Sequence, residues 1–550
     1  MTIASGAVPP RDMDPVGWGD PARRAGLPTH ARRWLAKEIG LPDRRTPPAP
    51  LSDLALPESR LSDDDHAALA EAVGAANVRD DRDTLLRHAG GKSYLDLARR
   101  RRAEADVPDA VVLPADHAGV LAVLRVCAER RIAVVPFGGG TSVVGGVAPL
   151  AGEQAAVISL DLRRLADPVR VDAESLTVTV GPGMRGPDLE KRLSAHGLTL
   201  GHFPQSWEHA TLGGYAATRS SGQASSGYGR FDDLVVGLQL ATPSGSLTLG
   251  RGPASAAGPD LKALILGSEG AFGIITELTL RVRRLPEIVH DEGWSFRTFA
   301  EGVTALRRLT QAGLAPEIAR LSDADETRAN LAFAGGGKTR MLRGILAARG
   351  HSGGCLLIAG WEGPRLVVRD RRNAATALLR AAGGIRLGTA VGQAWRRHRY
   401  DGPYLRDDLL DHGALVETLE TATSWTDVVG LYDTIRSALR SELTQGGTRP
   451  LVMAHISHLY PTGASLYFTA LAARDDSDAD GQWQRAKERV TDVITSAGAT
   501  ITHHHAVGTD HRPWLEEEIG SLGIDVLRAV KSVLDPAGVL NPGKLIPPSN

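Results

Sequence analysis

The chain has 550 residues, 42% of them hydrophobic, and its 63 Lys and Arg residues nearly balance its 64 Asp and Glu residues. This length predicts at least two domains with sizeable cores, and the balanced charge excludes the broad basic surface that nucleic acid binding requires. The two cysteines, Cys127 and Cys355, are far apart in the sequence, which argues against a disulfide framework, zinc or an iron–sulfur centre.

These features predict a cytoplasmic protein without a resident metal. The N-terminus lacks the basic-then-apolar pattern of a signal peptide, and no stretch reaches the roughly 20 apolar residues that cross a bilayer. The C-terminal letters PPSN are no peroxisomal signal. Peripheral contact with a membrane is left open.

Helices and strands are expected to alternate along the chain. The first 60 or so residues predict two helix-like patches around an extended, proline-rich arm at 42–50. Further on, Asp116 is suited to cap a helix whose inner face carries Val120, Leu124 and Cys127. IAVVPF, AAVISLDL and LTVTVGPG then read as strands, and the pattern predicts an α+β fold without internal repeats.

Two segments imitate ligand loops but lack essential residues. GGGKT at 335–339 resembles the end of a phosphate-binding loop, yet Ala332 stands where the first glycine belongs and ETRANLAF before it predicts a helix. A flexible loop is therefore expected. A calcium loop is suggested by Asp476, Asp478, Asp480 and Gly481, but Lys487 occupies the position that needs a glutamate, so we expect a solvated acidic turn.

Three glycine-rich segments are suited to a large planar cofactor. PFGGGTSVVGG at 136–146 follows a predicted strand and offers backbone N–H groups without obstructing β-carbons, which suits a pyrophosphate; alone it also fits a glycine-rich hairpin. The segments at 204–229 and 267–275 add main chain, hydroxyl groups and small side chains. Together, in this order, the three segments indicate a flavin.

With these segments the chain resembles the vanillyl-alcohol oxidase/p-cresol methylhydroxylase flavoprotein family, over roughly 105–285 and again at DPAGVLNPGK, 535–544. The resemblance implies a two-part FAD-binding domain of the vanillyl-alcohol oxidase type with an α+β cap, or substrate, domain. We expect four regions: an N-terminal helical arm and the start of the FAD domain (1–104), the FAD-binding domain (105–285), the cap (286–500) and a C-terminal segment that returns to the FAD site (501–550).

The resemblance also assigns cofactor contacts residue by residue. Those expected at the pyrophosphate are Pro136, Phe137, Gly138, Gly139, Gly140, Thr141, Ser142 and Val143. Those expected along the flavin are Pro204, Ser206, Thr211, Gly213, Gly214, Thr218, Arg219, Ser220 and Ser221. Those expected at the adenine end or ring edge are Glu269, Gly270, Gly273, Ile274 and Ile275. Because the first glycine loop lacks the histidine that links FAD covalently in some relatives, we expect non-covalent FAD.

Within the family, the chain resembles a subgroup of synthases in ether lipid biosynthesis. THHHAVG, GASLYF, YLRD and APEIARLSD carry this resemblance, together with GWGD at 17–20 and GLPT at 26–29. The subgroup exchanges the fatty acyl group of acyl-dihydroxyacetone phosphate for a long-chain fatty alcohol, with FAD as a covalent trap and no net redox change. The resemblance implies these two substrates and a homodimer.

The matched motifs imply roles for six residues. His503, His504 and His505 would act as acid and base, with His504 as the proton carrier. Tyr467 would work on the acyl group, Arg406 would clamp the leaving carboxylate, and Arg320 would lie near the flavin or the phosphate. Without the resemblance, such histidines read as surface residues or adventitious metal ligands, the tyrosine as core and the arginines as surface ion pairs.

Two departures and two rival functions accompany this interpretation. Ala506 replaces a glycine of the subgroup, and MAHISHLYPT lacks an arginine of the eukaryotic pattern. One rival is an FAD-dependent D-2-hydroxyacid dehydrogenase acting on lactate-like or glycolate-like acids; its EHGxG motif would place a glutamate where His504 stands. The other is a flavin-binding protein without catalysis, which would leave the histidines unexplained.

Overall fold

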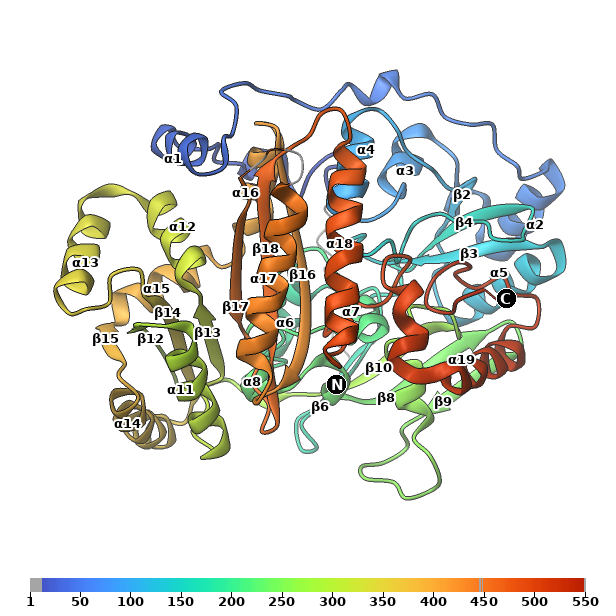
Figure 1. Cartoon of the computed structure of the whole chain (residues 1–550). Helices are drawn as coiled ribbons and strands as arrows, with labels where there is room; N and C mark the ends of the chain where they lie inside the picture. Colours follow the sequence, from blue (N-terminus) through green and yellow to red (C-terminus); the bar gives the residue numbers. More distant parts are fainter. Residues whose placement is uncertain (1–11, 445–446, 448, 549–550) are drawn as a thin grey trace.

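The computed structural model describes residues 12–444, 447 and 449–548, and within them the strands form four sheets (Figure 1). The first sheet has the order β1-β2-β4-β3, with β3 and β2 both parallel to β4. Its strands are β1 (Val78–Arg79), β2 (Ala110–Val112), β3 (Ile132–Phe137) and β4 (Ala156–Asp161). β3 and β4 are almost entirely buried, as expected for parallel strands.

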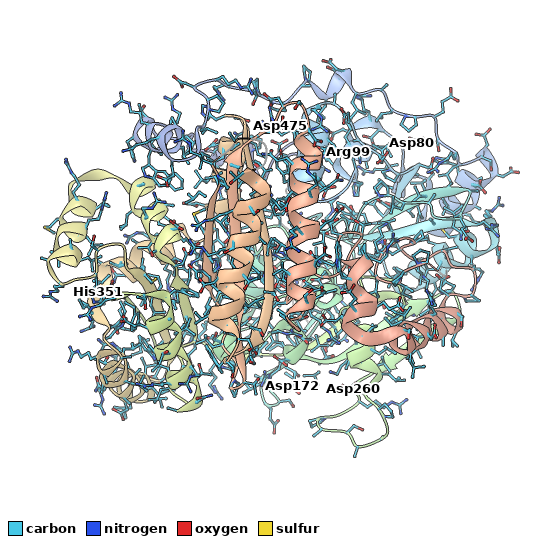
Figure 2. The ribbon with its side chains drawn as sticks, in the orientation of Figure 1. Asp80, Arg99, Asp172, Asp260, His351 and Asp475 are labelled. Carbon is cyan, nitrogen blue, oxygen red and sulfur yellow. The ribbon has the colours of Figure 1, made fainter. Side chains whose placement is uncertain are left out.

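The second sheet is antiparallel and has the order β5-β6-β10-β8-β9. Its strands are β5 (Val169–Asp172), β6 (Thr177–Val180), β8 (Val235–Thr242), β9 (Gly245–Leu249) and β10 (Ile274–Arg281). A small pair joins β7 (Leu198–Thr199) to β11 (Arg283–Arg284). The exposed Asp172 and Asp260 mark connections at the rim of this half (Figure 2).

The third large sheet forms the cap and has the order β15-β12-β14-β13-β17-β18-β16. Its strands are β12 (Ile288–Phe296), β13 (Ile318–Ser322), β14 (Cys355–Gly363), β15 (Ile385–Gly388), β16 (Ala414–Ser424), β17 (Leu451–Ile456) and β18 (Gly463–Ala473). All its pairings are antiparallel, so consecutive side chains alternate between the two faces. One face packs in the largest hydrophobic core. The other faces the half of the molecule that contains the first two sheets and the three glycine-rich segments, which is called the glycine-rich half below.

Helices pack around these sheets, and some of them also line the space between the two halves. The glycine-rich half carries α5 (His117–Arg130), α6 (Gly186–Ser194), α7 (Leu212–Thr218), α8 (Ser225–Tyr228), α9 (Phe231–Leu234), α10 (Leu261–Ile265) and α19 (Leu515–Leu534). The cap carries α11 (Phe299–Gln311), α12 (Ala324–Ala334), α13 (Gly336–Ala348), α14 (Arg365–Ala381), α15 (Thr389–His398), α16 (Gly402–Leu410), α17 (Val428–Thr444) and α18 (Ala479–Ser496). The N-terminal region supplies α1 (Thr29–Ile39), α2 (Asp63–Val73), α3 (Arg82–Arg87) and α4 (Tyr94–Arg101).

Several predicted elements are confirmed. IAVVPF is β3, and β4 and β6 lie inside the other two predicted strands. The carboxylate of Asp116 accepts a hydrogen bond of 2.8 Å from the backbone N–H of Gly119 and so caps α5. Val120, Leu124 and Cys127 are fully buried along that helix.

Two local predictions are wrong. GGGKT is no loop, because Gly336 begins α13 and strong helix formers in MLRGILAA extend the helix back into the glycines. The second N-terminal helical patch is only a 3-10 turn, Leu51–Asp53, since Pro57 follows closely. The acidic turn is confirmed in part: Asp476 pairs with Arg44 and Arg474, but Asp480 lies inside α18, which Asp478 caps.

The C-terminal segment returns to the glycine-rich half. The backbone N–H of Val134 in β3 donates to the carbonyl of Val539 at 2.8 Å. The side-chain amide of Asn541 donates to the carbonyl of Glu269 at 2.7 Å. At the front of Figure 1, α17 and α18 pack together over the cap sheet. None of the helices described is both long and apolar enough to span a bilayer.

Candidate active site

A cavity of about 520 Å3 lies between the glycine-rich half and the inner face of the cap sheet. All residues predicted to bind the cofactor line it, with one exception. The guanidinium of Arg219 points away and donates to the carbonyl groups of Leu266, at 2.8 Å, and Ala263, at 2.6 Å. Arg219 therefore braces α10 against α7 instead of contacting the cavity.

The first glycine loop is shaped for close approach. A β-carbon on Gly138 would lie 2.3 Å from Oγ1 of Thr211, and one on Gly139 would lie 2.2 Å from the carbonyl oxygen of His209. The backbone N–H groups of Gly139, Gly140 and Thr141 donate no hydrogen bond to any residue that the structure describes. Such a row of available donors in a side-chain-free cradle fits the pyrophosphate of FAD.

On the opposite wall, strand register assembles a row of polar side chains. Glu420 of β16 lies directly opposite Tyr467 of β18, and Tyr467 lies opposite His455 of β17. Their neighbours Leu419, Phe468 and Ala454 point to the other face, into the hydrophobic core. The two-residue period of the strands thus brings Tyr467 and His455 to the cavity.

The histidine triplet lies against this row. The backbone N–H groups of His503, His504 and His505 donate to the carboxylate of Glu420 at 2.7, 3.0 and 2.9 Å respectively. His504 and His505 line the cavity, whereas His503 lies behind them, with its Nε2 2.6 Å from the hydroxyl of Tyr460. The Nδ1 atoms of His503 and His504 are 2.9 Å apart, so one proton joins them.

Burial lowers the pKa of two of these three histidines. Desolvation lowers the pKa of His503 to about 3 and that of His505 to about 3. Both rings are therefore neutral near pH 7. The side chain of His504 is 16% exposed, and its Nδ1 lies 3.5 Å from Oε2 of Glu420. Nδ1 of His503 lies 3.8 Å from the same oxygen, so Glu420 faces two rings of the triplet.

Arg320, His455 and Glu326 form a hydrogen-bonded triangle at the cavity wall. Nη1 of Arg320 donates to Nε2 of His455 at 3.0 Å, and Nη2 donates to Oε1 of Glu326 at 2.7 Å. Because Arg320 can only donate, Nε2 of His455 must accept, and its Nδ1–H then donates to Glu326 at 3.1 Å. Burial and Arg320 lower the pKa of His455, so this ring is neutral.

Arg406 is an incompletely satisfied cation in the wall of the cavity. Its Nη1 donates to the carbonyl of Lys92 at 2.6 Å, and its Nη2 lies 3.7 Å from Oδ1 of Asp407. Its Nε and Nη2 are buried and donate no hydrogen bond within the described chain. Buried donors of this kind are costly unless a ligand accepts from them, which fits an anionic group of a substrate.

Glu269 links the cavity floor to the segment after the triplet. Its carboxylate accepts hydrogen bonds of 2.9 Å from the backbone N–H of Val507 and of 2.9 Å from that of Gly508. Desolvation raises the pKa of Glu269 to about 7 although these hydrogen bonds act in the opposite direction. The residue predicted to contact FAD therefore also positions the turn that carries the histidines.

Sequence reasoning missed several residues of the site. His455 and His458 both line the cavity, and their signal was present in MAHISHLYPT, a short segment that carries two histidines. His458 has a buried Nδ1 without a hydrogen-bond partner among the described residues. Glu420 had no local signal, because its partners are 82 to 85 residues away in the chain. Glu326 meets His455 across 129 residues.

Comparisons with known proteins agree with this geometry. A model of the FAD binding domain matches residues 108–249, and one of the C-terminal domain of FAD linked oxidases matches 285–545. The chain is 34% identical over 534 residues to the alkyldihydroxyacetonephosphate synthase of Dictyostelium discoideum, covering 94% of this chain and 87% of that protein. A solved alkyldihydroxyacetonephosphate synthase superposes with a TM-score of 0.82 at 30% identity, covering 96% of this chain and 98% of that one. A mitochondrial D-lactate dehydrogenase of Arabidopsis thaliana is more distant, at 26% identity over 80% of this chain and 74% of its own length.

Proposed function

Because the chain belongs to the alkyldihydroxyacetonephosphate synthase family of FAD-linked oxidases, we propose that it exchanges the acyl group of acyl-dihydroxyacetone phosphate for a long-chain fatty alcohol. One observation carries the proposal. His504, Tyr467, Arg406 and Arg320 line the same cavity as the glycine-rich cofactor segments. The exchange consumes one alcohol O–H group and releases one fatty acid, so it needs groups that move a proton and bind a carboxylate.

The protonation states suit a division of labour. Desolvation raises the pKa of Tyr467 to about 12, so its hydroxyl stays protonated and donates to an oxygen of the acyl ester. His504, beside Glu420, is the ring best placed to take the proton from the alcohol. His503 and His505, held neutral by burial, orient it and cannot compete for the proton.

Two cations recognise the anionic groups of the substrate. The unsatisfied Nε and Nη2 of Arg406 can bind both oxygens of the departing carboxylate. Arg320 is held rigidly by Glu326 and faces the cavity, where it neutralises the phosphate or the flavin. The glycine segments would hold FAD, which would supply the reactive centre for the sugar-phosphate carbon with no net electron transfer.

The aliphatic chains of both substrates need an apolar region. Part of the cavity wall supplies it, through Phe333, Leu405, Leu409, Val416, Met453 and Leu471. From Phe333 the chain continues into α13, which presents the exposed Met341 and Ile345 beside the exposed Arg340 and Arg343. This composition supports peripheral contact with an anionic membrane, which co-sedimentation with lipid vesicles would test.

Two further expectations concern the state of the protein in the cell. Cys127 and Cys355 are both buried and unpaired, which supports a reducing compartment such as the cytoplasm. The family resemblance supports a homodimer. Its mass in solution, measured by light scattering, should be twice the 58.2 kDa of the chain.

The deciding experiment incubates the purified flavoprotein with palmitoyl-dihydroxyacetone phosphate and hexadecanol. Mass spectrometry should detect alkyl-dihydroxyacetone phosphate and palmitate in equal amounts. The variants His504→Ala and Tyr467→Phe should lose both products while they retain bound flavin. Absence of both products, together with bleaching of the flavin by D-lactate without air, would replace the proposal with the dehydrogenase. No response to either substrate class would leave a flavin-binding role.

A further inference from the structure

The carboxylate of Glu420 contacts every residue of the histidine triplet and the residue before it. Besides the three backbone N–H groups, the hydroxyl of Thr502 donates to Oε1 at 2.7 Å. The side chain of Glu420 is 0% exposed, so no water competes for these oxygens. Glu420 precedes His503 by 83 residues, which means that a distant strand holds the turn at 502–505.

Glu420 also supplies negative charge at the triplet. Its Oε2 lies 3.5 Å from Nδ1 of His504, and within 4 Å of that ring no other carboxylate occurs among the described residues. Burial raises the pKa of Glu420, but His504, His505 and His503 outweigh it and hold the pKa well below its usual value. The other titratable groups that face His504 are all neutral near pH 7, so they supply no negative charge to its ring. They are His202, His455, His458, Tyr467, His503 and His505.

We propose that Glu420 is a positioning residue that clamps the turn at 502–505 against the cavity and acts as the counter-ion of protonated His504. The inference deepens the proposed function, on which it rests, because it names the residue that positions the proposed proton carrier His504. The register of the cap sheet sets this arrangement, since Glu420 lies opposite Tyr467 and brings the histidines over its ring.

Two substitutions separate the clamp from the charge. In Glu420→Gln, the amide oxygen can occupy the place of Oε1, which accepts from Thr502 and from the backbone N–H groups of His503, His504 and His505. Its NH2 group then occupies the place of Oε2, where it can no longer accept from His503, so most of the clamp stays and the charge is lost. Glu420→Ala removes both. Glu420→Asp keeps the charge but shortens the side chain.

The first measurement is the pH dependence of kcat for the exchange reaction. Loss of the counter-ion disfavours the imidazolium form of His504, so the limb of the profile that reports this ring should move to lower pH by about one unit or more in Glu420→Gln. The direction is the same whether the ring acts as acid or as base. Glu420→Asp should keep the limb near its original pH while kcat falls.

Thr502→Val is the matched control. It removes one hydrogen bond to the same oxygen without changing any charge. It should lower the melting temperature and leave the position of the pH limb where it is in the parent protein. A purely structural role for Glu420 would make Glu420→Gln behave like this control.

The clamp is tested without activity, by hydrogen–deuterium exchange of the peptide that contains 502–505 in the flavin-loaded protein. Glu420→Ala should lose protection of this peptide, whereas Glu420→Gln should keep most of it. An unchanged pH limb in Glu420→Gln would refute the counter-ion role, and intact protection in Glu420→Ala would refute the clamp. If the parent protein forms no ether product, the proposed function fails, and the exchange experiment still decides the clamp.

Discussion

Arg406 illustrates at the residue scale how an unsatisfied side chain identifies a ligand site. Folding has removed its guanidinium from water, and Nε and Nη2 have gained no hydrogen bond in return. Arg101 is a nearby contrast, since its guanidinium pairs with the carboxylate of Asp411 and with backbone carbonyls. Of these two arginines, only Arg406 lines the cavity.

We therefore expect Arg406→Met to weaken binding of acyl-dihydroxyacetone phosphate. Hydrogen bonds to charged groups contribute about 1.5–3 kcal/mol, so KM for this substrate should rise about 10- to 100-fold. Steady-state kinetics at fixed hexadecanol would measure the change. The control Arg101→Met should lower the melting temperature without a comparable rise in KM. An unchanged KM in Arg406→Met would remove this arginine from the substrate site.

Ala506 is a second residue with a local consequence. Its φ of 75° lies in the left-handed region, where a β-carbon is unfavourable by about 1–2 kcal/mol. Because glycine loses more chain entropy on folding, Ala506→Gly should raise the free energy of unfolding by only about 0.5 kcal/mol. Urea denaturation would measure it. Ala486→Gly, inside α18, should instead destabilise by about 1 kcal/mol, and a similar loss at 506 would contradict the argument.

At the scale of elements, the alternation of strands decides which side chains meet. In β17 and β18, alternate residues enter the hydrophobic core and residues between them line the cavity. The sequence alone nominated Tyr467, and the register of β18 with β16 and β17 placed Glu420 and His455 beside it. Neither pairing could be inferred from residue type.

Glu269 connects two elements and makes stability depend on pH. Its pKa, about 7, is raised above the ordinary value of 4.5, so its contribution is present at pH below 4.5 and is lost as the pH rises through about 7. Relative to Glu269→Gln, the parent protein should lose about 1–3 kcal/mol of unfolding free energy between pH 5 and pH 8. Urea denaturation of both flavin-loaded proteins at these pH values would measure the difference.

Glu292 provides a control, because its pKa is shifted in the direction opposite to that of Glu269. Burial raises the pKa of Glu292, but the hydrogen bonds from Trp294 and Arg372 lower it by more, so the pKa lies below its ordinary value. Its contribution is lost only when the pH falls below about 4.5. The difference between the parent protein and Glu292→Gln should therefore be constant from pH 5 to pH 8. The same constancy for Glu269→Gln would show that Glu269 is ionised throughout.

At the scale of the whole molecule, the site exists only because two halves meet. The glycine segments come from the half that contains β3, β8 and β10, whereas Tyr467, Arg406 and Arg320 come from the cap. The histidine turn joins them, since Glu420 of the cap and Glu269 of the other half hold neighbouring parts of it. A cofactor in this cavity would contact both halves.

Bound FAD should therefore be removable but stabilising. The loop at 136–146 contains no His, Cys or Tyr that could form a covalent link. Precipitation with trichloroacetic acid should leave the flavin in the supernatant, and a yellow pellet would contradict this expectation. Added FAD should raise the melting temperature of the stripped protein in proportion to the logarithm of its concentration, because it binds only the folded state.

The sequence by itself determined the strands around the first glycine loop and the helix cap at Asp116. These depend on local patterns: burial runs and capping residues. The cofactor contacts are implied by the family resemblance and stay predictions; all of them except Arg219 line the cavity. GGGKT was misjudged because the helix-forming residues after it decide its conformation.

Only the tertiary structure decided how the chemistry is assembled. Glu420 reaches the histidine turn across 83 residues of sequence, and Arg320 meets His455 across 135. Strand register and burial set these encounters, and burial also makes His503 and His505 neutral while His504 keeps a carboxylate beside it. A sequence specifies which groups are available, but desolvation and distance, which determine their protonation and partners, arise only when the chain folds.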